Sequence, residues 1–524
     1  MNFKLLLTLS ACLLGAHVSA SPYIPLSDQC DAYPKLALGT DVNLCVGLLV
    51  QKSPDIALKM PRTAVETPEG KLLVVDMGGW VGNKGKLWLI NYHSKTPTAV
   101  VLLSDLNLPH KILKGIDGKY YLGEAHRIIR FELAKDAVAR QETVIDALPY
   151  HDDYLHPLKN FVFDKNNNLI VSVGSTSDRC KDNASNCTTG MEAGLWQFNY
   201  QAESASWSTK YTIVASGLRN SMALAVHSSG TLLQAENSMD FPNADEPYEE
   251  INLIELGGFY GWPLCYDRHV AVDETQKTCT AKNYREPWSL MPPHVAPLDA
   301  LYYQHNKLPS LTNKLLMTWH GYKIVGHRMV AFDVDEQGRP VRTNAATYSS
   351  DPLKGGDGFK VQEFKAIGGA GLVAQHREII SRWNEINGFR PKGAPTGMSV
   401  MNDGSLLIVD DKNAAILRLS TGAPYQELAQ KPEAKVASVT ATVTVPEAIR
   451  SILLNRCNKC HELLQSTPEQ LLNANHWLLK TNGQTRMAQK LFEDKVMPMP
   501  PDNSLLAAER AQLKTWLEGL DKSN

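Results

Sequence analysis

Short apolar segments recur in pairs along residues 58–420, and each pair is joined at a glycine or asparagine. Five copies of this unit span residues 60–76, 108–124, 156–174, 219–236 and 394–411. The equivalent turn residues are Gly70, Gly118, Asn167, Gly230 and Gly404. Two short apolar segments joined by such a turn are typical of a β-hairpin. The pattern therefore predicts a repeated, all-β architecture.

The spacing of these turns predicts a β-propeller. The first three intervals between turn residues are 48, 49 and 63 residues, which suit one four-stranded blade each. The 174 residues between Gly230 and Gly404 leave room for one more blade, for which residues 308–334 are the candidate. We therefore predict a six-bladed propeller over residues 21–420, with equivalent positions of all blades surrounding one central channel.

Polar residues stand just before the first strand of most copies. Aligned at their turns, the copies place Arg62, His110, His156, Arg219 with Asn220, and Ala394 at this position. Arginine and histidine recur where a purely structural repeat would carry small or apolar residues. A ring of cationic and imidazole groups at one mouth of the channel indicates a site for an anionic ligand. The alternative is a set of solvated loop residues.

The sequence CNKCH at residues 457–461 is typical of covalent attachment of a c-type haem. Cys457 and Cys460 would form the thioether bonds, and His461 would be the proximal iron ligand. The alternatives are a disulfide or half of a zinc site, but no second cysteine pair follows to complete a zinc tetrahedron.

A methionine on the proline-rich turn downstream can supply the distal haem ligand. Met499 is the preferred candidate and Met497 is the alternative. Helical patterns at 445–457 and 505–517 bracket this region. Residues 448–524 thus resemble a small all-α class I cytochrome c domain. Residues 421–447 lack periodicity and are predicted to be a linker.

Composition and charge narrow the functional class. The chain has 524 residues and a net charge of −2, which favours neither nucleic acid nor an anionic membrane as a partner. Residues 1–20 are predicted to be a secretory signal peptide, with lipoprotein processing at Cys12 as the alternative. No later stretch is apolar enough to predict a transmembrane segment.

Cysteine usage indicates an oxidising compartment. The chain has 9 cysteines, and six of them fall in local pairs once Cys12 and the haem pair are set aside. The pairs, proposed from proximity alone, are Cys30 with Cys45, Cys180 with Cys187, and Cys265 with Cys279. Haem c, a signal peptide and disulfides together predict the periplasm.

Several motifs resemble the glucose/sorbosone dehydrogenase family, the soluble sugar dehydrogenases that carry pyrroloquinoline quinone (PQQ) on a six-bladed propeller. They are LRN at 218–220, QAEN at 234–237, EINLI at 250–254 and GGFYGWP at 257–263. Residues 156–175 resemble the third-blade motif that begins with the catalytic histidine. The resemblance covers roughly residues 55–420.

The resemblance implies roles for individual residues. His156 would be the general base, and Arg219 and Asn220 would lie over the quinone. The backbone carbonyls of Ser238 and Met239 would hold a calcium ion that also binds PQQ.

Further candidates for binding PQQ are Arg62, from the ring described above, and His320 or Lys323, either of which could replace the fifth-blade lysine of the family. Ser175 and Ala394 depart from the pattern of the glucose dehydrogenases, where an aspartate and an arginine are usual. These departures favour the sorbosone or pyranose branch.

The sequence therefore predicts a periplasmic quinohaemoprotein dehydrogenase. A sugar or related alcohol or aldehyde hydrate would be oxidised by PQQ, with electrons passing to haem c and then to another cytochrome or a respiratory oxidase. One alternative is a calcium-dependent propeller hydrolase of the lactonase type. Another is a PQQ-free module that binds carbohydrate or carries electrons.

Overall fold

In a computed structural model, the chain divides into two compact units, with Ala20–Gln426 in one and Glu427–Asn524 in the other. The structure describes residues 23–93, 96–151, 154–179, 192–241, 246–272, 279, 281–321, 326–343, 373–383, 392–424, 445–457, 468, 472, 478, 480–481, 484–488, 491–492 and 505–522.

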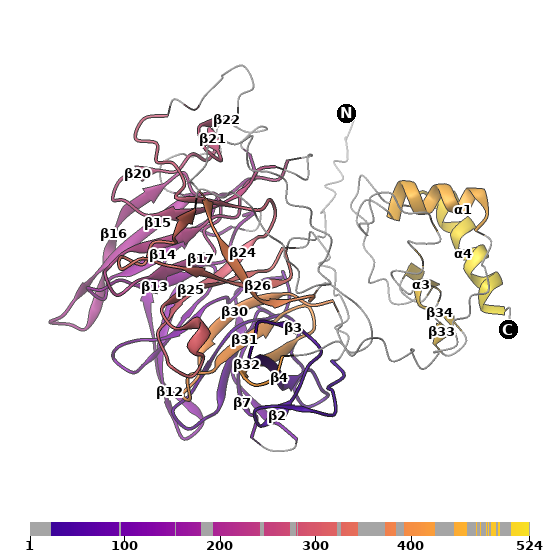
Figure 1. Cartoon of the computed structure of the whole chain (residues 1–524), viewed down its shortest axis with the longest axis horizontal. Coiled ribbons are helices and arrows are strands. Elements are labelled where there is room, and N and C mark those ends of the chain that lie inside the picture. Colours follow the sequence, from indigo (N-terminus) through magenta and orange to yellow (C-terminus); the bar gives the residue numbers. More distant parts are fainter. Residues whose placement is uncertain are drawn as a thin grey trace, which may run out of the picture. The chain divides into compact units, whose positions relative to one another are not determined.

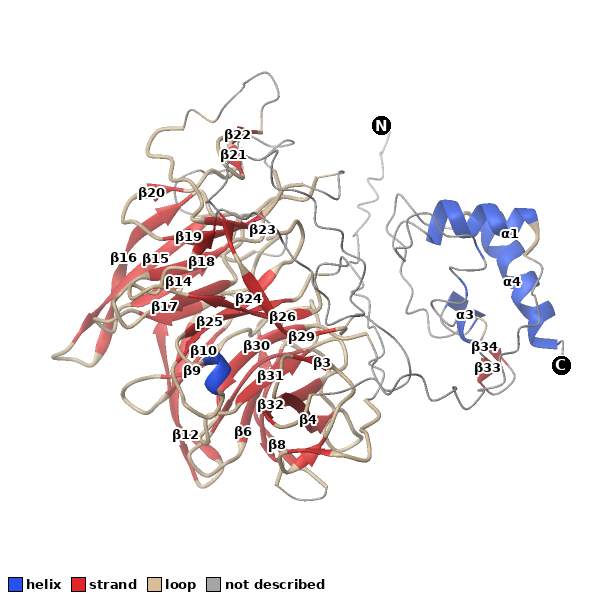
Figure 2. Ribbon diagram, in the orientation of Figure 1, coloured by secondary structure: helices blue, strands red, loops and turns tan. Residues whose placement is uncertain are grey.

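Six antiparallel-based sheets of four or five strands make up the larger unit (Figures 1 and 2). Blade 1 contains β5 (Pro61–Glu66), β6 (Leu72–Asp76), β7 (Gly85–Asn91) and β8 (Thr98–Leu106). Blade 2 contains β9 (Ile112–Lys114), β10 (Tyr120–Gly123), β11 (Ile128–Ala134) and β12 (Ala137–Ile145). Blade 3 contains β13 (Phe161–Phe163), β14 (Leu169–Val173), β15 (Gly194–Gln201), β16 (Ser206–Ser216) and β20 (Gly258–Phe259).

The second half of the ring follows the same order. Blade 4 contains β17 (Ala223–Val226), β18 (Leu232–Ala235), β19 (Glu249–Leu253) and β23 (Ser289–Met291). Blade 5 contains β24 (Pro297–Tyr303), β25 (Lys314–Trp319), β26 (Arg328–Asp333), β29 (His376–Ser381) and β3 (Gly39–Thr40). Blade 6 contains β30 (Pro395–Val400), β31 (Leu406–Asp410), β32 (Ala415–Thr421) and β4 (Leu44–Gln51). The predicted six-bladed propeller is confirmed.

Several shorter elements lie between the strands of the blades or outside them. A short 3-10 turn, Pro309–Leu311, precedes β25. Among the described residues of the larger unit, three two-stranded sheets stand outside the blades: β1 (Gln29–Cys30) with β2 (Tyr33–Pro34), β21 (Cys265–Tyr266) with β22 (Val270–Ala271), and β27 (Arg342–Thr343) with β28 (Val373–Ala374).

The turn residues seen in the sequence do join the first two strands of their blades. Each has a positive φ and donates its backbone N–H to the carbonyl three residues earlier, as in Gly70 to Thr67 and Gly404 to Met401. The fifth blade is the exception. Its first strand begins at Pro297 rather than near residue 308, because a long connection containing the 3-10 turn separates β24 from β25. The predicted segment 308–334 therefore covers the second and third strands.

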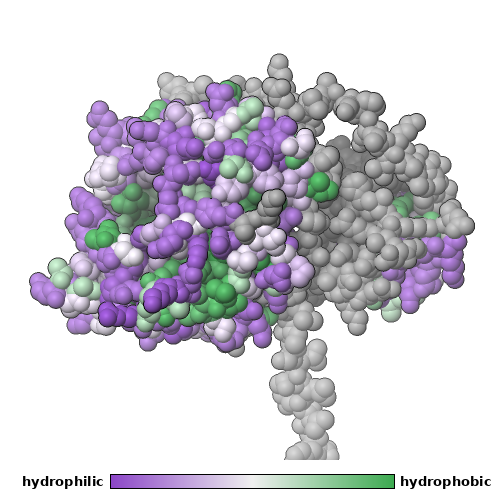
Figure 3. All heavy atoms as spheres, turned by 90° about the horizontal axis from the view of Figure 1, so that it is seen from below, coloured by the Kyte–Doolittle hydropathy of each residue, from purple (hydrophilic) through white to green (hydrophobic). Residues whose placement is uncertain are grey.

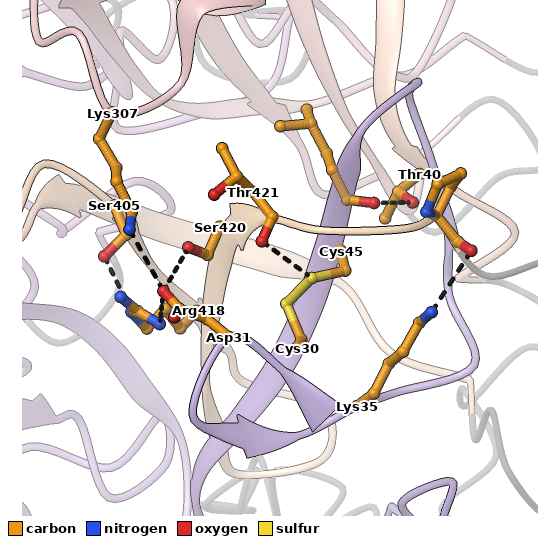
Figure 4. Close-up of a disulfide and its surroundings, with 12 residues drawn as sticks. Cys30, Asp31, Lys35, Thr40, Cys45, Lys307, Ser405, Arg418, Ser420 and Thr421 are labelled. Atoms are coloured by element: carbon orange, nitrogen blue, oxygen red, sulfur yellow. Dashed lines mark hydrogen bonds and ion pairs between the residues drawn. A yellow bond between two sulfur atoms is a disulfide. The ribbon is translucent and has the colours of Figure 1, made fainter. Parts of the chain in front are cut away.

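An N-terminal strand closes the ring. β4 pairs antiparallel with β32, so the last blade is completed by residues from the start of the chain. Asp31, beside β4, forms an ion pair with Arg418 Nη1 at 2.9 Å and accepts a hydrogen bond from Ser420 Oγ at 3.0 Å (Figure 4). The sequence repeat did not reveal this strand, because residues 44–51 precede the first copy.

Two predicted disulfides are confirmed within the described residues. Cys30 bonds to Cys45 on β4, and Cys265 bonds to Cys279, each with a Cα–Cα distance of 5.6 Å. Cys180 and Cys187 lie outside the described residues. The first disulfide covalently links the closing strand β4 to β1, which precedes it in the chain (Figure 4).

Removing the Cys30–Cys45 bond should destabilise the closed ring. Constraining a loop of this length is worth about 3 kcal/mol through the entropy of the unfolded chain. We expect Cys30→Ser/Cys45→Ser to lower the free energy of unfolding by about that amount, measured by urea titration of near-UV circular dichroism. Cys265→Ser/Cys279→Ser is the matched control, since its loop lies outside the six blades. Equal midpoints for wild type and the Cys30/Cys45 variant would contradict the role in closure.

The C-terminal unit contains the two helices expected from the sequence pattern. α1 (Glu447–Ile452) continues into a π-helical turn, Leu453–Cys457, and α4 spans Ala507–Lys522. Apolar side chains at helical spacing pack these elements together, including Ile449, Leu453, Leu513 and Leu517. Arg456 forms a two-oxygen ion pair with Glu509 across them at 3.1–3.2 Å.

Short elements complete this unit. α3 (Arg486–Ala488) follows a hairpin of β33 (Lys480–Thr481) and β34 (Gln484–Thr485) that the all-α prediction did not include. Thr421 ends β32 and Glu447 begins α1, so the predicted linker boundaries each overlap regular structure by one residue. Within the residues described, no helix is long and apolar enough to span a membrane.

Candidate functional site at the channel mouth

The candidate site residues of the propeller lie at one end of the blades. They stand either just before the first strand of a blade or just after its second strand. Since successive strands run in opposite directions, these two places meet at the same end, opposite the turns at Gly70 and its equivalents. First strands of neighbouring blades contact one another around the ring, as β5 does with β9 and β30. The first strand is thus the innermost one.

Carboxylates at the end of the second strand fix the chain that enters the first strand. Four blades share this arrangement, with backbone N–H donors at 2.7–3.1 Å: Met60 to Asp76, Asn107 to Glu124, Asn220 to Glu236, and Ala394 to Asp410. These four acidic residues therefore anchor the channel mouth.

Blade 3 has Gly174 in place of the carboxylate. A Cβ at this position would lie 2.6 Å from the Cβ of His156 and 2.7 Å from its carbonyl oxygen. The same atom would lie 3.5 Å from Asn220 Oδ1. The glycine therefore lets the segment carrying His156 approach the end of β14, and it brings His156 and Asn220 near one another.

His156 is held in a form that can accept a proton. Its Nδ1 lies 2.9 Å from both the carbonyl oxygen and the hydroxyl of Ser175. A carbonyl only accepts hydrogen bonds, so Nδ1 carries the hydrogen and Nε2 presents its lone pair. Burial lowers the pKa of His156 well below its usual value, and the charges of Arg219 and Lys159 act in the same direction. The imidazole is therefore neutral at physiological pH.

Arg219 is buried beside this histidine and already has acidic partners. Its Nε and Nη2 lie 3.0 and 2.8 Å from Asp178 Oδ1, and Nη1 donates to the carbonyl of Asn237 at 2.9 Å. Asp240 lies farther off, 3.6 Å from Nη2. Asp178, which no sequence motif indicated, fixes the guanidinium and balances its charge.

A second ion-paired arginine lies on the side of blades 1 and 6. Arg62 Nη1 is 2.6 Å from Asp411 Oδ2, and His320 Nε2 is 2.9 Å from Asp411 Oδ1. Burial alone would raise the pKa of Asp411, but His320, Arg62 and Lys412 outweigh it and lower the pKa to about 2. Asp411 is therefore an anion. The predicted cationic ring thus also contains aspartates that pair with its arginines. Aligning the repeated copies at their turns did not reveal these aspartates.

One buried donor at this mouth has no hydrogen-bond partner among the described residues. His110 Nδ1 faces Arg62 Nε at 3.3 Å, which leaves the hydrogen on Nε2. His110 is 1% exposed, and its Nε2 has no hydrogen-bond partner among the described residues. Lys412 is partly buried, and burial and nearby Lys392 lower its pKa to about 8. These groups fit a ligand rich in carboxylate and carbonyl oxygens.

The expected calcium loop, Ser238 and Met239, follows the end of β18 in sequence. Ser238 donates its N–H to Glu249 Oε2 at 2.5 Å, and the Met239 side chain is 2% exposed. Within the described part of the chain, no backbone N–H outside the strands donates to either carbonyl oxygen. The two carbonyls can thus accept a hard cation. No cluster of three or more His, Cys, Asp or Glu side chains suited to a metal occurs among the residues described.

The mouth has an apolar floor and cross-blade bonds beneath it. The floor residues are Met77, Leu108, Ala125, Leu158, Met222 and Leu298. Lys111 and Asp299, from opposite blades, form a buried ion pair at 2.6 Å, and Asn237 Nδ2 donates to the carbonyl of Pro297 at 2.8 Å. These contacts hold the blades in register below the site.

The remaining predicted residues are not all described. Ala394 is fully buried, and its backbone N–H donates a hydrogen bond to Asp410. Lys323 lies outside the described residues, as do the haem residues Cys460, His461, Met497 and Met499. Cys457 ends the π-helical turn, and only its backbone is described.

Comparison with known families found a match within the propeller. A family model described as Glucose / Sorbosone dehydrogenase matches residues 117–351. Residues 117–351 of the propeller are thus similar to the glucose/sorbosone dehydrogenase family. The match confirms the enzyme class predicted from the sequence, a sugar dehydrogenase. The matched segment contains His156, Arg219 and Asn220, whereas Arg62 and Asp411 lie outside it.

Solved structures share the fold of the propeller. A Trichoderma reesei protein of Carbohydrate-Active Enzymes Family AA12 has a TM-score of 0.55 and 18% identity, with 76% of this chain and 100% of that chain covered. The PQQ domain of a pyranose dehydrogenase from Coprinopsis cinerea, in its holo form, has a TM-score of 0.54 and 17% identity, with coverage of 74% and 98%. No curated protein sequence matches this chain at a significant level.

Proposed function

We propose that this chain is a periplasmic quinohaemoprotein that oxidises a sugar, or a related alcohol or aldehyde hydrate, with PQQ and passes the electrons to a covalently bound haem c. The observation that carries the proposal is the neutral, oriented His156 beside Arg219, inside the segment matched by the family model. A base and a fixed guanidinium at one channel mouth suit proton removal from a hydroxyl next to an anionic cofactor.

The residues at the channel mouth suggest which groups would hold the cofactors. Arg62, His110 and Lys412, with His320 and Lys323 as further candidates, would hold the anionic groups of PQQ. The carbonyls of Ser238 and Met239 would hold calcium. When bound, PQQ would supply an acceptor for two electrons.

Within this assignment the residues of the chain have separate tasks. His156 Nε2 would accept the hydroxyl proton of the substrate, because Ser175 occupies Nδ1. Arg219, fixed by Asp178, would orient the groups above the site rather than supply a free charge. The apolar floor and the surrounding blades would keep water away from the base.

The haem assignment rests on the C-terminal sequence. Cys457 and Cys460 would bind the porphyrin, His461 would be the proximal ligand, and Met499, or Met497 in its place, would be the distal one. Support comes from the helices α1 and α4, which flank the motif in sequence and pack together. The signal peptide over residues 1–20 and an external cytochrome or oxidase as final acceptor belong to the same proposal.

Cofactor dependence tests the proposal. We expect sugar oxidation, followed with a soluble dye acceptor, only when PQQ and calcium are both added to the purified full chain. Omitting PQQ, omitting calcium, and adding a chelator are the controls. Activity that is independent of PQQ would contradict the dehydrogenase assignment, and hydrolysis of a lactone under the same conditions would favour the lactonase reading.

The pH dependence of the reaction should follow the lowered pKa of His156. A base works only when unprotonated, so activity is lost as pH falls through the pKa of the folded protein. Since burial and the charges of Arg219 and Lys159 lower that pKa, the acidic limb of kcat/KM should lie well below the ordinary histidine value of about 6.5. A pH profile of kcat/KM measures this. An acidic limb at or above the ordinary value would show that His156 is not the base in this environment.

A further inference from the structure

Lys159 is a buried lysine to which the proposed reaction gives no task. The face of the propeller drawn in Figure 3 is mainly hydrophilic, as expected when charged side chains lie at the surface. Lys159 is an exception, because it is 0% exposed and is one of the largest fully buried side chains among the described residues. Burying an amine is unfavourable unless its contacts offset the loss of water. A lysine at this position, three residues after His156, therefore needs a reason.

The amine of Lys159 contacts the chain on both sides of His156. Its Nζ donates a hydrogen bond to the carbonyl of Pro157 at 2.9 Å and lies 5.0 Å from the centre of the Tyr154 ring. Pro157 follows His156 directly, and Tyr154 precedes it by two residues. One amine thus joins the two ends of the bend that carries the candidate base.

Further hydrogen bonds attach this bend to β14 and the residues that follow it. The Tyr154 hydroxyl donates to the carbonyl of Gly174 at 2.7 Å, next to Ser175, which holds Nδ1 of His156. After the bend, the N–H of Asn160 donates to Ser172 Oγ at 2.9 Å. Lys159 connects these attachments across the bend. The direction of His156 Nε2 therefore depends on the whole set of contacts.

Lys159 also acts on His156 through its charge. Burial lowers the pKa of Lys159 to about 7, although the charge of Glu192 opposes this effect. His151 acts on Glu192 in turn. Burial and Arg219 lower the pKa of His156, and the charge of Lys159 acts in the same direction. At the acidic pH values where His156 gains a second proton, Lys159 is charged and disfavours that proton.

We propose that Lys159 is a positioning residue for the reaction at His156, which fixes the bend between Tyr154 and Pro157 so that Nε2 is directed at the substrate. This inference rests on the proposed function and adds to it a residue that acts through the base. An apolar side chain of similar length would fill the same space. It could not donate to the Pro157 carbonyl, and it would not place a charge near the imidazole.

Lys159→Met tests the role in positioning. Methionine has a similar length and suits a buried site, so the fold should be retained, as near-UV circular dichroism checks. With the holoenzyme we expect kcat for sugar to fall roughly ten-fold, because a slightly misplaced base is costly in rate. KM and the PQQ titration should change little. Lys165→Met is the matched control, since Lys165 is exposed in the turn between β13 and β14, at the opposite end of the same blade. An unchanged kcat in Lys159→Met would overturn the inference.

The pH profile separates this role from a loss of stability alone. Lys159→Met removes a positive charge that disfavours protonated His156, so the acidic limb of kcat/KM should move to higher pH by roughly one pH unit. Tyr154→Phe keeps the ring near Nζ and loses only the hydrogen bond to Gly174, so kcat should fall while the limb stays in place. If Lys159→Met does not fold, Tyr154→Phe carries the test, and an unchanged kcat there would overturn the inference.

A titration without turnover separates this inference from the proposed function. Nitrogen-15 histidine NMR of the full chain, with the His156 signal assigned by its loss in His156→Ala, follows protonation of the imidazole directly. We expect His156 to gain its second proton at higher pH in Lys159→Met than in wild type or Lys165→Met. Equal titrations in all three proteins would overturn the inference even if wild type oxidises sugar. Absence of PQQ-dependent oxidation in wild type, with the titration shifted in Lys159→Met, would instead overturn the proposed function and support the contact between Lys159 and the base.

Discussion

Replacing His156 by alanine should lower turnover with sugar by roughly 10²–10⁴-fold, the usual contribution of a positioned general base. The reason lies in its geometry, since Ser175 holds Nδ1 at 2.9 Å and leaves Nε2 to take the substrate proton. Loss of the imidazole leaves the ion pair of Arg219 with Asp178 intact. The concentration of PQQ that gives half-maximal activity should therefore change little. Turnover number and PQQ titration, measured on the same preparation, check both halves of this expectation.

His151→Ala is the matched control for this experiment. His151 is an exposed histidine that precedes the base by five residues, so its removal should leave turnover near wild type. Ser175→Ala is informative as well, because the backbone carbonyl still accepts the Nδ1 hydrogen and only the hydroxyl contact is lost. Near-normal turnover in His156→Ala would place the base elsewhere, with His320 the next residue to test.

Asp411→Ala should destabilise the propeller by about 3–5 kcal/mol, because it leaves a buried guanidinium without its counter-ion. The side chains of Arg62 and Asp411 are only 4% and 7% exposed, and their contact joins blades 1 and 6. His320, from blade 5, loses its partner in the same variant. Denaturant unfolding of the propeller measures the loss.

A double-mutant cycle gives the control for this ion pair. In Arg62→Met/Asp411→Ala no unpaired buried charge of the pair remains, so the double variant should be more stable than Asp411→Ala alone. Since the pKa of Asp411 is lowered to about 2, its stabilising contribution is present above the unfolded value of about 4 and is lost as pH falls from there through about 2. A cost below about 1 kcal/mol for Asp411→Ala would mean that solvent already screens the pair.

The number of blades was predictable because most blades contain a hairpin with a recognisable sequence pattern. Apolar pairs around Gly70, Gly118 and Gly404 carry both the alternation of strands and a turn residue suited to a positive φ. The closing strand carried no such signal, because β4 pairs with β32, which lies more than 360 residues away in the sequence. The start of the fifth blade was predicted at the wrong place. Its first two strands are joined by a long connection that lacks the repeated glycine, so the sequence pattern did not mark its first strand.

The candidate site was predictable only in part for the same physical reason. His156 and Arg219 stand within motifs that can be recognised along the chain. Asp178 and Asp411 could not be found that way, because they meet their arginines across 41 and 349 residues of sequence. Gly174 is a subtler case: its role as the space for His156 is visible only when the Cβ that it lacks is placed in the structure.

The most direct test is rapid mixing of the holoenzyme, loaded with PQQ and calcium, with sugar in the absence of any external acceptor, while the haem absorbance is recorded. We expect the haem to be reduced within the turnover time of the enzyme in wild type. The haem should stay oxidised in His156→Ala and in wild type without PQQ. A holoenzyme that oxidises sugar with a dye acceptor while its haem stays oxidised would contradict electron transfer from the propeller to the C-terminal unit.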